Sequence, residues 1–311
     1  MPERVAVIGA GVSGLTCAVV CAERGWPTEI LAEQIGATSL AAAAMWYPYD
    51  AGPPARAIPW ALQTYRKLEE LTSSPETGVS IITLRMFSRS TQIEIPEWAI
   101  PLGAARIRSM IPPAFVSGFT LDVPLTDSTV YLNYLAQRFQ NVGGVIHLDQ
   151  RLDRLEEVDP AFDLIINCTG IGARDLTHDP DLEPHRGQVV IVSKLELAGA
   201  VVSDDAPLMY AIPRGSDCVF GGTNDVSDNE SVDPVTTASI LDECSRVLGI
   251  SEPPVIRERV GLRPFRRSGV RLESGMLADG RRVIHNYGHG GAGYTLSWGC
   301  ADEVAGIAAA R

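Results

Sequence analysis

The sequence predicts an α/β fold in which a Rossmann-like nucleotide-binding domain is interrupted by a mainly antiparallel β-sheet. Three observations lead to this prediction. A β-branched run is followed at once by the pattern G-x-G-x-x-G and an apolar helical stretch, "RVAVIGAGVSGLTCAVVCAERG". Two later apolar runs, 162–173 and 281–291, each contain glycine-rich turns. Between them lie short alternating segments separated by turn residues, which are typical of antiparallel strands.

The N-terminal segment contains every part of a dinucleotide-binding motif. Residues 5–8 form a β-branched strand, after which Gly9 permits a tight turn, Gly11 lets a pyrophosphate approach the backbone, and Gly14 lets the helix pack closely on the strand. The next strand, "PTEILAE", ends at Glu33, where a carboxylate accepts hydrogen bonds from an adenosine ribose. This segment alone does not distinguish NAD from FAD, but the carboxylate disfavours NADP.

The later segments are read in chain order. Residues 51–130 are rich in proline and irregular, with one amphipathic helix at "PWALQTYRKLEELTSS". The runs 162–173 and 281–291 are expected to add parallel strands to the first sheet, whose carboxyl ends bind ligands. Segments 208–213 and 218–223 flank "RGSD" as a hairpin. The sequence therefore predicts a discontinuous nucleotide domain and an inserted substrate domain, with the ranges 1–50, 128–185 and 275–311 for the first and 51–127 and 186–274 for the second.

Composition and charge narrow the class of protein. The 311 residues carry a net charge of −12, which argues against non-specific binding to nucleic acid or to anionic membranes. The six cysteines show no CxxC spacing and are expected to be buried free thiols. The chain enters a strand directly and has no apolar run of transmembrane length, so we expect a cytoplasmic protein. His285 and His289 lie in a glycine-rich region, not on one helix face, so no metal site is expected.

Several motifs then occur together in one order. They are "AAAAMWYPY" (41–49), "NCTG" (167–170), "RGQ" (186–188), "YAIPRG" (210–215), "GLRP" (261–264) and "HNYGHGGAGYTLSWG" (285–299). In these motifs the sequence resembles the D-amino-acid oxidase family of FAD enzymes, which includes the D-aspartate oxidases. The resemblance covers nearly the whole chain. It implies FAD as cofactor, a D-amino acid as substrate and dioxygen as the final electron acceptor.

Carried over residue by residue, the resemblance places FAD along four groups of residues. The pyrophosphate side is Gly9, Gly11, Val12, Ser13 and Gly14, with Glu33 at the ribose. The chain then follows the cofactor at Thr38, Ser39, Ala43, Ala44 and Met45, and the middle strands add Leu152 and Thr169. The pyrimidine end of the flavin is wrapped by Gly290, Gly291, Ala292, Gly293, Tyr294 and Thr295. Glycine leaves the backbone open to a planar ring, and N–H groups at a helix N-terminus stabilise negative charge on the reduced ring.

The substrate side is assigned in the same way. Arg263 would grip the substrate carboxylate bidentately, and Tyr210 would donate its hydroxyl to the same group. From spacing alone, Tyr210 reads as a core residue. The carbonyl of Gly291 would accept from the substrate amine, and Tyr49 would line the pocket. No strong base is required if the amine binds neutral and the Cα hydrogen leaves as hydride to flavin N5, giving a 2-oxo acid, ammonia and hydrogen peroxide.

The sequence also departs from the family pattern. Many members carry a lid with an additional tyrosine shortly before Tyr210, whereas "VVSDDAPLMY" has no aromatic residue there, and Ala292 replaces a larger residue. A wide mouth and neutral or apolar substrates are therefore expected. The alternatives are a D-aspartate oxidase, which would need a second cation such as Arg214 or Arg56, and a glycine- or sarcosine-type amine oxidase. An NAD-dependent dehydrogenase or a non-catalytic nucleotide-binding protein is a remoter alternative. Dimers are common in the family, so a homodimer is compatible with the resemblance.

Overall fold

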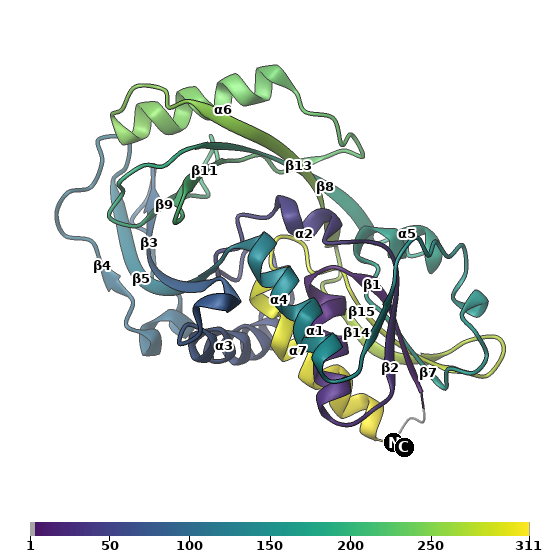
Figure 1. Ribbon diagram of the computed structural model, residues 1–311. Helices are drawn as coiled ribbons and strands as arrows, with labels where there is room; N and C mark the ends of the chain where they lie inside the picture. The colour runs from purple at the N-terminus through teal and green to yellow at the C-terminus, as the bar shows by residue number, and fades with distance from the viewer. Residues whose placement is uncertain (1–3, 311) are drawn as a thin grey trace. The chain divides into compact units, whose positions relative to one another are not determined.

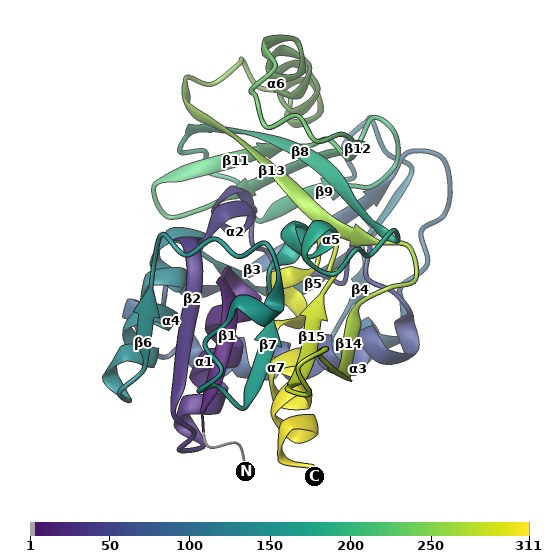
Figure 2. The same ribbon diagram turned by 90° about the vertical axis from the view of Figure 1, so that its right-hand side faces the viewer.

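The N-terminal β-branched run forms a central strand of a six-stranded sheet in the computed structural model, which describes residues 4–310. The strands of this sheet are β1 (Val5–Ala10), β2 (Thr28–Ile35), β6 (Val145–His147), β7 (Leu164–Asn167), β14 (Arg271–Met276) and β15 (Arg282–Tyr287). Their order is β14-β15-β7-β1-β2-β6, which Figure 2 shows. The sheet therefore joins segments from the beginning, middle and end of the chain.

Five of these strands are parallel. β1 pairs in parallel with β2 and with β7, β2 pairs with β6, and β7 pairs with β15. Only β14, at one edge, is antiparallel to its neighbour β15. The expectation that 162–173 and 281–291 would add parallel strands to the first sheet is confirmed. Their carboxyl ends consequently lie at the same edge of the sheet, where open α/β sheets bind ligands.

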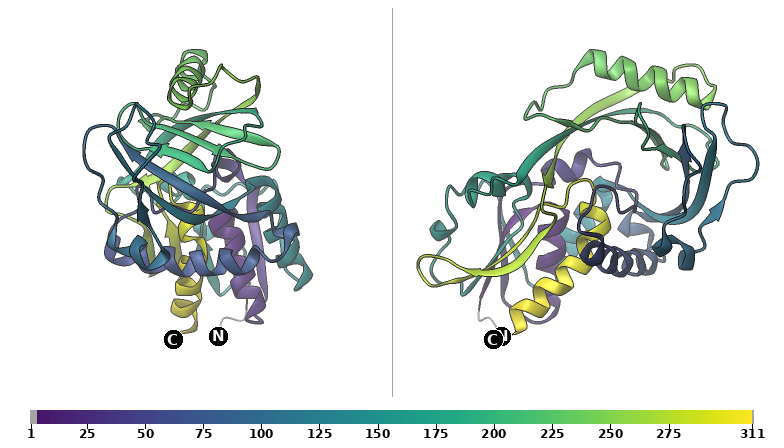
Figure 3. Two further views of the ribbon diagram at one scale, coloured as in Figure 1. Left: turned by 90° about the vertical axis from the view of Figure 1, so that its left-hand side faces the viewer. Right: turned by 180° about the vertical axis from the view of Figure 1, so that it is seen from behind.

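Three long helices accompany this sheet. They are α1 (Val12–Glu23), α4 (Ser128–Asn141) and α7 (Gly293–Ala309), and α7 packs on α1 and on a further helix, α3 (Pro54–Leu71). Figure 3 shows the yellow α7 beside α3. A Cβ on Gly299 would lie 2.4 Å from Cα of Trp60, so the two helix backbones approach closely only because this position is glycine. The expected helix near residue 59 is present, and it begins earlier, with Pro54 in its first turn.

The chain divides into two units, whose elements are labelled in Figure 1. Unit 1 comprises Met1–Val79, Thr126–His185 and Leu262–Arg311, and unit 2 comprises Ser80–Leu125 and Arg186–Gly261. Residues 51–79 thus belong with the parallel sheet, because α3 packs on α7. The functional assignment of each unit remains a prediction.

Unit 2 is built on a nine-stranded sheet. Its strands are β3 (Val79–Ser88), β4 (Ala105–Arg106), β5 (Ser117–Thr126), β8 (Leu182–Ser193), β9 (Ala200–Ser203), β10 (Met209–Pro213), β11 (Asp217–Gly221), β12 (Asp225–Val226) and β13 (Val255–Arg266). β9, β10, β11 and β8 pair antiparallel in turn, whereas β3 pairs in parallel with β9. The predicted hairpin around "RGSD" is the β10–β11 pair. β8 and β13 both continue into unit 1.

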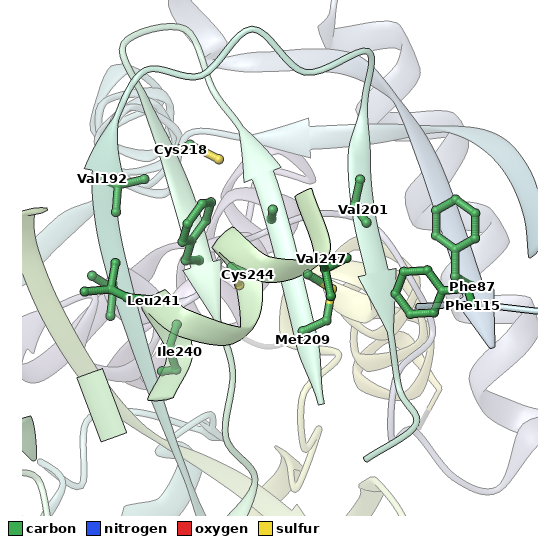
Figure 4. Close-up of a cluster of buried hydrophobic side chains, with 13 residues drawn as sticks. Phe87, Phe115, Val192, Val201, Met209, Cys218, Ile240, Leu241, Cys244 and Val247 are labelled. Atoms are coloured by element: carbon green, nitrogen blue, oxygen red, sulfur yellow. The ribbon is translucent and has the colours of Figure 1, made fainter. Parts of the chain in front are cut away.

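The core of unit 2 lies between this sheet and the helix α6 (Pro234–Leu248). Figure 4 shows α6 presenting Ile240, Leu241, Cys244 and Val247 to the side chains of the strands. Phe87 and Phe115 stack at a centroid distance of 4.9 Å at one end of this cluster. The side chain of Asp233 caps α6 by accepting from the N–H groups of Val235 and Thr236.

The remaining elements are short. They are the helices α2 (Ala37–Ala41) and α5 (Ala173–Leu176) and the 3₁₀ turns η1 (Pro75–Thr77), η2 (Glu97–Leu102), η3 (Leu155–Glu157) and η4 (Gly170–Gly172). Both α2 and α5 follow the carboxyl ends of parallel strands of the first sheet. They therefore belong to the edge at which a ligand is expected.

Candidate active site

The turn after β1 brings two glycines into contacts that no side chain would allow. Gly9 has a φ of +101°, and a Cβ on Gly14 would lie 1.9 Å from the carbonyl oxygen of Gly9. The backbone of Gly9 also lies close to that of Cys168, because a Cβ on Gly9 would be 2.6 Å from the carbonyl oxygen of Cys168. Helix α1 therefore starts directly against the strand. Its first backbone N–H, that of Val12, points toward the ligand edge and donates to Oγ of Ser39 at 3.1 Å.

A second helix begins at the same place. A Cβ on Gly293, the first residue of α7, would lie 3.6 Å from Cγ1 of Val12, the first residue of α1. The Tyr294 hydroxyl donates to the carbonyl of Ser39 at 3.0 Å. Two helix N-termini thus converge, and each offers backbone N–H groups and a partial positive charge. This arrangement suits an extended anionic ligand such as a dinucleotide.

The glycine loop before α7 is fixed by its neighbours. Gly290 has a φ of +54°, and a Cβ there would lie 2.7 Å from the carbonyl oxygen of Asp50. Gly291 is exposed on its backbone, and a Cβ there would lie 2.6 Å from Cδ1 of Tyr49. Thr295, in the first turn of α7, binds the segment that contains Tyr49 and Asp50, because its hydroxyl donates to the carbonyl of Tyr47 at 2.9 Å. The loop is therefore an open backbone surface between a helix N-terminus and an aromatic ring.

The strand that carries Arg263 is attached to these segments on both sides of that residue. The Thr38 hydroxyl donates to the carbonyl of Leu262 at 3.0 Å, and the N–H of Gly290 donates to the carbonyl of Pro264 at 2.9 Å. Arg263 itself is partly buried on β13. Two residues that the sequence assigns to the cofactor thus hold the backbone immediately before and after the residue assigned to the substrate.

Buried polar side chains support the site from below. Oδ1 of Asn167 accepts from the N–H and the hydroxyl of Thr169, at 3.2 and 2.7 Å. His289 Nε2 lies 3.0 Å from Oδ1 of Asn286, whose amide nitrogen faces the sulfur of Cys17 at 3.2 Å. Burial lowers the pKa of His289 to about 4, so its ring is neutral at pH 7 and donates to Asn286. These contacts fix the turns that follow β7 and β15.

The other residues assigned to the cofactor make fewer contacts with the two helix N-termini. The Glu33 side chain is 61% exposed near the end of β2 and lies 3.5 Å from Nη1 of Arg151. Leu152 packs on the apolar cluster beneath the sheet. The carbonyl of Ala44 accepts from the N–H and hydroxyl of Thr126, and Ala43 and Met45 are partly buried beside it. The Glu33 carboxylate is therefore exposed at the end of β2, with one long contact to an exposed arginine.

Tyr210 belongs to unit 2, unlike the other residues assigned to the site. It is the second residue of β10, and its ring packs against Gly221, the last residue of β11, and against Gly222, which follows it. A Cβ on Gly221 would lie 2.4 Å from the Tyr210 hydroxyl, and a Cβ on Gly222 would lie 2.6 Å from its Cε1. The Gly221–Gly222 pair therefore forms a slot that sets the direction of the hydroxyl. The adjacent glycines of "DCVFGGTN" are the feature of the sequence that could have indicated this contact.

The remaining arginines near these strands have structural partners. The Asp179 carboxylate accepts from Nε of Arg266 and from the Tyr287 hydroxyl, both at 2.9 Å, and Arg271 donates to that same hydroxyl at 2.6 Å. Burial opposes ionisation of Asp179, but the bonds from Arg266 and Tyr287 outweigh it and lower the pKa of the carboxyl. Arg266 and Arg271 therefore have structural roles, because both are bound to this buried Asp179–Tyr287 pair.

The two cations suggested for an acidic substrate are also engaged. Nε of Arg214 donates to Asp217 at 2.6 Å, and both side chains are nearly buried. Arg56 donates to Glu303 at 3.1 Å and to the carbonyl of Leu272 at 3.0 Å. Each guanidinium is therefore committed to a carboxylate of the protein itself.

The chemical inventory of the described chain is otherwise plain. All six cysteines are buried and free, as expected. Within residues 4–310, no group of three or more His, Cys, Asp or Glu side chains could hold a metal ion. None of the helices that the structure describes is both long enough and apolar enough to span a bilayer.

The converging helix N-termini and the open glycine loop define a dinucleotide-binding oxidoreductase fold, and comparison with known proteins agrees. Residues 4–307 match the family model described as FAD dependent oxidoreductase. The chain is 38% identical to a D-amino-acid oxidase of Rubrobacter xylanophilus, over 99% of this chain and 96% of that protein. It is 34% identical to the human D-aspartate oxidase, over 97% and 93% of the two chains. The crystal structure of glycine oxidase from Geobacillus kaustophilus superposes with a TM-score of 0.82 at 18% identity, covering 98% of this chain and 94% of that one.

The chain belongs to the FAD-dependent oxidoreductase family. The resemblance inferred from the sequence motifs is thereby confirmed, as is FAD as the cofactor. The glycines Gly9, Gly14, Gly290 and Gly291 fit this cofactor, because a Cβ at any of them would collide with neighbouring protein atoms and displace the turns that present backbone N–H groups at the two helix N-termini.

Proposed function

We propose that this protein oxidises neutral and apolar D-amino acids to 2-oxo acids, with release of ammonia and hydrogen peroxide. The observation that carries the proposal is the attachment of Arg263 to the cofactor segments, through Thr38 to Leu262 and through Gly290 to Pro264. A substrate carboxylate held by Arg263 would therefore have its position fixed relative to the glycine loop. The similarity to a named D-amino-acid oxidase along nearly the whole chain supports the same activity.

The proposed work of the side chains is binding and orientation. Arg263 offers a planar pair of donors to the carboxylate, and Tyr210 donates its hydroxyl to the same group. The carbonyl of Gly291, on the exposed part of the loop, accepts from the substrate amine. Tyr49 packs against Gly291 and limits where the amine can lie. Orientation of this kind accounts for a large share of rate enhancement when no proton has to be abstracted by a strong base.

The cofactor would be held by unit 1. The pyrophosphate is assigned to the N–H groups where α1 begins and the ribose to Glu33. The N–H groups at the start of α7, from Gly293 to Thr295, are assigned to the flavin edge, where they stabilise negative charge. FAD, when bound, supplies the two-electron acceptor and passes the electrons on to dioxygen. Of the proposed substrate-binding residues, Tyr210 belongs to unit 2, whereas Tyr49, Arg263 and Gly291 belong to unit 1.

A D-aspartate oxidase is the alternative with a named relative, but no placed cation favours it. A second carboxylate needs a second cation, and both Arg214 and Arg56 already bind a carboxylate of the protein. Releasing either would leave Asp217 or Glu303 without its partner, which is costly for the nearly buried Asp217. We therefore place neutral substrates first.

An anaerobic titration of the purified protein tests the proposal. Panels of D- and L-amino acids are added separately while the flavin absorbance is followed. Bleaching by neutral D-amino acids and not by their L-enantiomers is expected. Bleaching by D-aspartate or glycine alone would replace the proposal with one of the alternatives, and a protein that binds no FAD would exclude an oxidase altogether. Light scattering on the same preparation tests whether the protein is a homodimer. A cytoplasmic location is proposed separately, because buried free thiols are typical of a reducing compartment.

A further inference from the structure

The loop that precedes Tyr210 is tied to a distant strand by one carboxylate. This loop, residues 204–208, connects β9 to β10, and all its contacts described here lie within unit 2. Oδ2 of Asp205 accepts from the Ser88 hydroxyl at 2.8 Å and from the N–H of Arg89 at 2.6 Å. Both donors lie at the end of β3, more than a hundred residues away in the sequence. These bonds lower the pKa of the Asp205 carboxyl, so it is ionised throughout the neutral range.

A second tie comes from Arg89 itself. Its guanidinium donates to the carbonyl of Pro207 at 3.0 Å, two residues further along the same loop. It also donates to Glu243 on α6 at 2.7 Å, and both of these side chains are only 14% exposed. The guanidinium lies over the ring of Phe115, with 5.0 Å between its Cζ and the ring centroid. The loop is thus held at Asp205 and at Pro207 by groups that are themselves fixed to the core of unit 2.

The attachment fixes the point at which Tyr210 enters its strand. Pro207 is three residues before Tyr210, and β10 begins at Met209. On the other side, the tyrosine ring rests on the Gly221–Gly222 slot. The ring is therefore bounded by the two glycines, and its strand begins two residues after the point at which the loop is held.

We infer that Asp205 is a positioning residue that holds the 204–208 loop rigid and thereby sets the Tyr210 hydroxyl for the substrate carboxylate. The inference rests on the proposed function, because it takes Tyr210 to be a substrate-binding residue. It adds that this loop does not open and close in each catalytic cycle. Substrate would then enter past a fixed edge, and the loop would contribute to KM through the position of Tyr210 and not to kcat through its motion.

Asp205→Asn is the principal test, because the amide keeps the size of the side chain and loses its charge. Hydrogen bonds to a charged group are stronger than neutral ones, so we expect KM for neutral D-amino acids to rise about tenfold with kcat nearly unchanged. The dissociation constant of benzoate, a carboxylate without an amine, should rise by a similar factor. The absorbance spectrum of bound FAD should stay as in the parent protein. Ser88→Ala removes one donor only and should give a smaller change in the same direction.

Asp122→Asn is the matched control, since Asp122 accepts from the Thr83 hydroxyl of the same strand β3 at 2.7 Å but is exposed. It should leave KM and benzoate binding unchanged. Hydrogen exchange of the amides in residues 203–210 gives a readout that needs no activity. These amides should exchange slowly in the parent and in Asp122→Asn, and much faster in Asp205→Asn.

The outcomes separate the inference from the function. Slow exchange in Asp205→Asn would show that the carboxylate does not anchor the loop, and fast exchange with an unchanged KM would show that the loop does not position Tyr210. Either result overturns the inference while the parent still oxidises D-amino acids. A parent that is reduced by no D-amino acid refutes the proposed function instead, whatever the exchange shows. If Asp205→Asn does not fold, Ser88→Ala carries the same comparison.

Discussion

The ring of Tyr49 lies against Gly291 so closely that a Cβ on Gly291 would be 2.6 Å from Cδ1 of the ring. Because the ring occupies this side of Gly291, the exposed side of the glycine backbone is left for ligands. The contact joins a residue assigned to the substrate pocket with the loop that would face the flavin. A side chain added at such a glycine would therefore have a measurable effect on activity.

Gly291→Ala should lower kcat/KM by about 100-fold, since displacement of the ring or of the loop by roughly an ångström misplaces the reacting groups. Steady-state kinetics with a neutral D-amino acid measure the effect. Gly306→Ala in the same helix α7 is the control, because a Cβ there meets nothing within 4 Å. That control should keep its activity and gain about 0.5–1 kcal/mol in stability. Equal losses in both variants would contradict the role given to the Tyr49 contact.

Arg263→Ala should raise KM for D-amino acids by about 100-fold, because it removes a bidentate, charge-assisted pair of hydrogen bonds. Arg263→Lys should recover only part of this loss, since an ammonium group cannot form the paired contact. Flavin absorbance and fluorescence should show that FAD remains bound. A KM within twofold of the parent would mean that another residue binds the carboxylate.

Gly222→Ala should weaken substrate binding through Tyr210, since its Cβ would lie 2.6 Å from the tyrosine ring. We expect KM to rise about tenfold, comparable to the loss of the Tyr210 hydrogen bond to a charged carboxylate. Gly215→Ala, in the turn of the same β-sheet unit, has nothing within 4 Å of its Cβ and should be silent. The prediction fails if both variants, or neither, change KM in kinetic assays at saturating dioxygen.

The buried His289 should make the protein less stable in mild acid. Its pKa of about 4 is below the value near 6.5 of an unfolded histidine. As the pH falls below 6.5, the unfolded chain takes up a proton that the folded protein refuses, so the free energy of unfolding decreases until about pH 4 and then levels. The linkage amounts to about 3 kcal/mol. Urea unfolding between pH 7.5 and 4.5 measures it, and His289→Gln, which keeps a donor for Asn286, should show a distinctly smaller pH dependence.

Four of the five parallel strands, β1, β2, β7 and β15, were predicted from apolar, β-branched runs, whereas the short β6 was not. Val5–Ala10 and Leu164–Asn167 are examples of such runs. The strands β3 and β5 were not predicted, since Thr, Arg and Ser interrupt the first, and the second, "SGFTLDVPLT", contains a proline. Helix α4 was also not identified, although Asp127 is a good N-cap in front of it. Local sequence patterns therefore predicted more of the strands of the nucleotide-binding unit than of the inserted sheet.

Motifs located the candidate site residues, but the contacts between them could not be predicted. Thr38 and Leu262 are far apart in the sequence, and nothing local to either residue indicates that one donates to the other. The same holds for Asp205 and its donors at Ser88 and Arg89. Such bonds depend on how separate segments fold together. The commitment of Arg214 and Arg56 to carboxylates is likewise a property of the tertiary structure alone.

The segmented sheet has a consequence for how the protein is made. β1 lies between β2 and β7, β7 pairs on its other side with β15, and α1 packs on α7. The sheet, the helix layer and the glycine loop to which β1 and α1 contribute are thus complete only after residues 282–309 have been synthesised. A nascent chain that lacks residues 282–309 has neither β15 nor α7 to offer. Binding of the yellow cofactor would then require residues 282–309, and products shortened before this segment should be colourless.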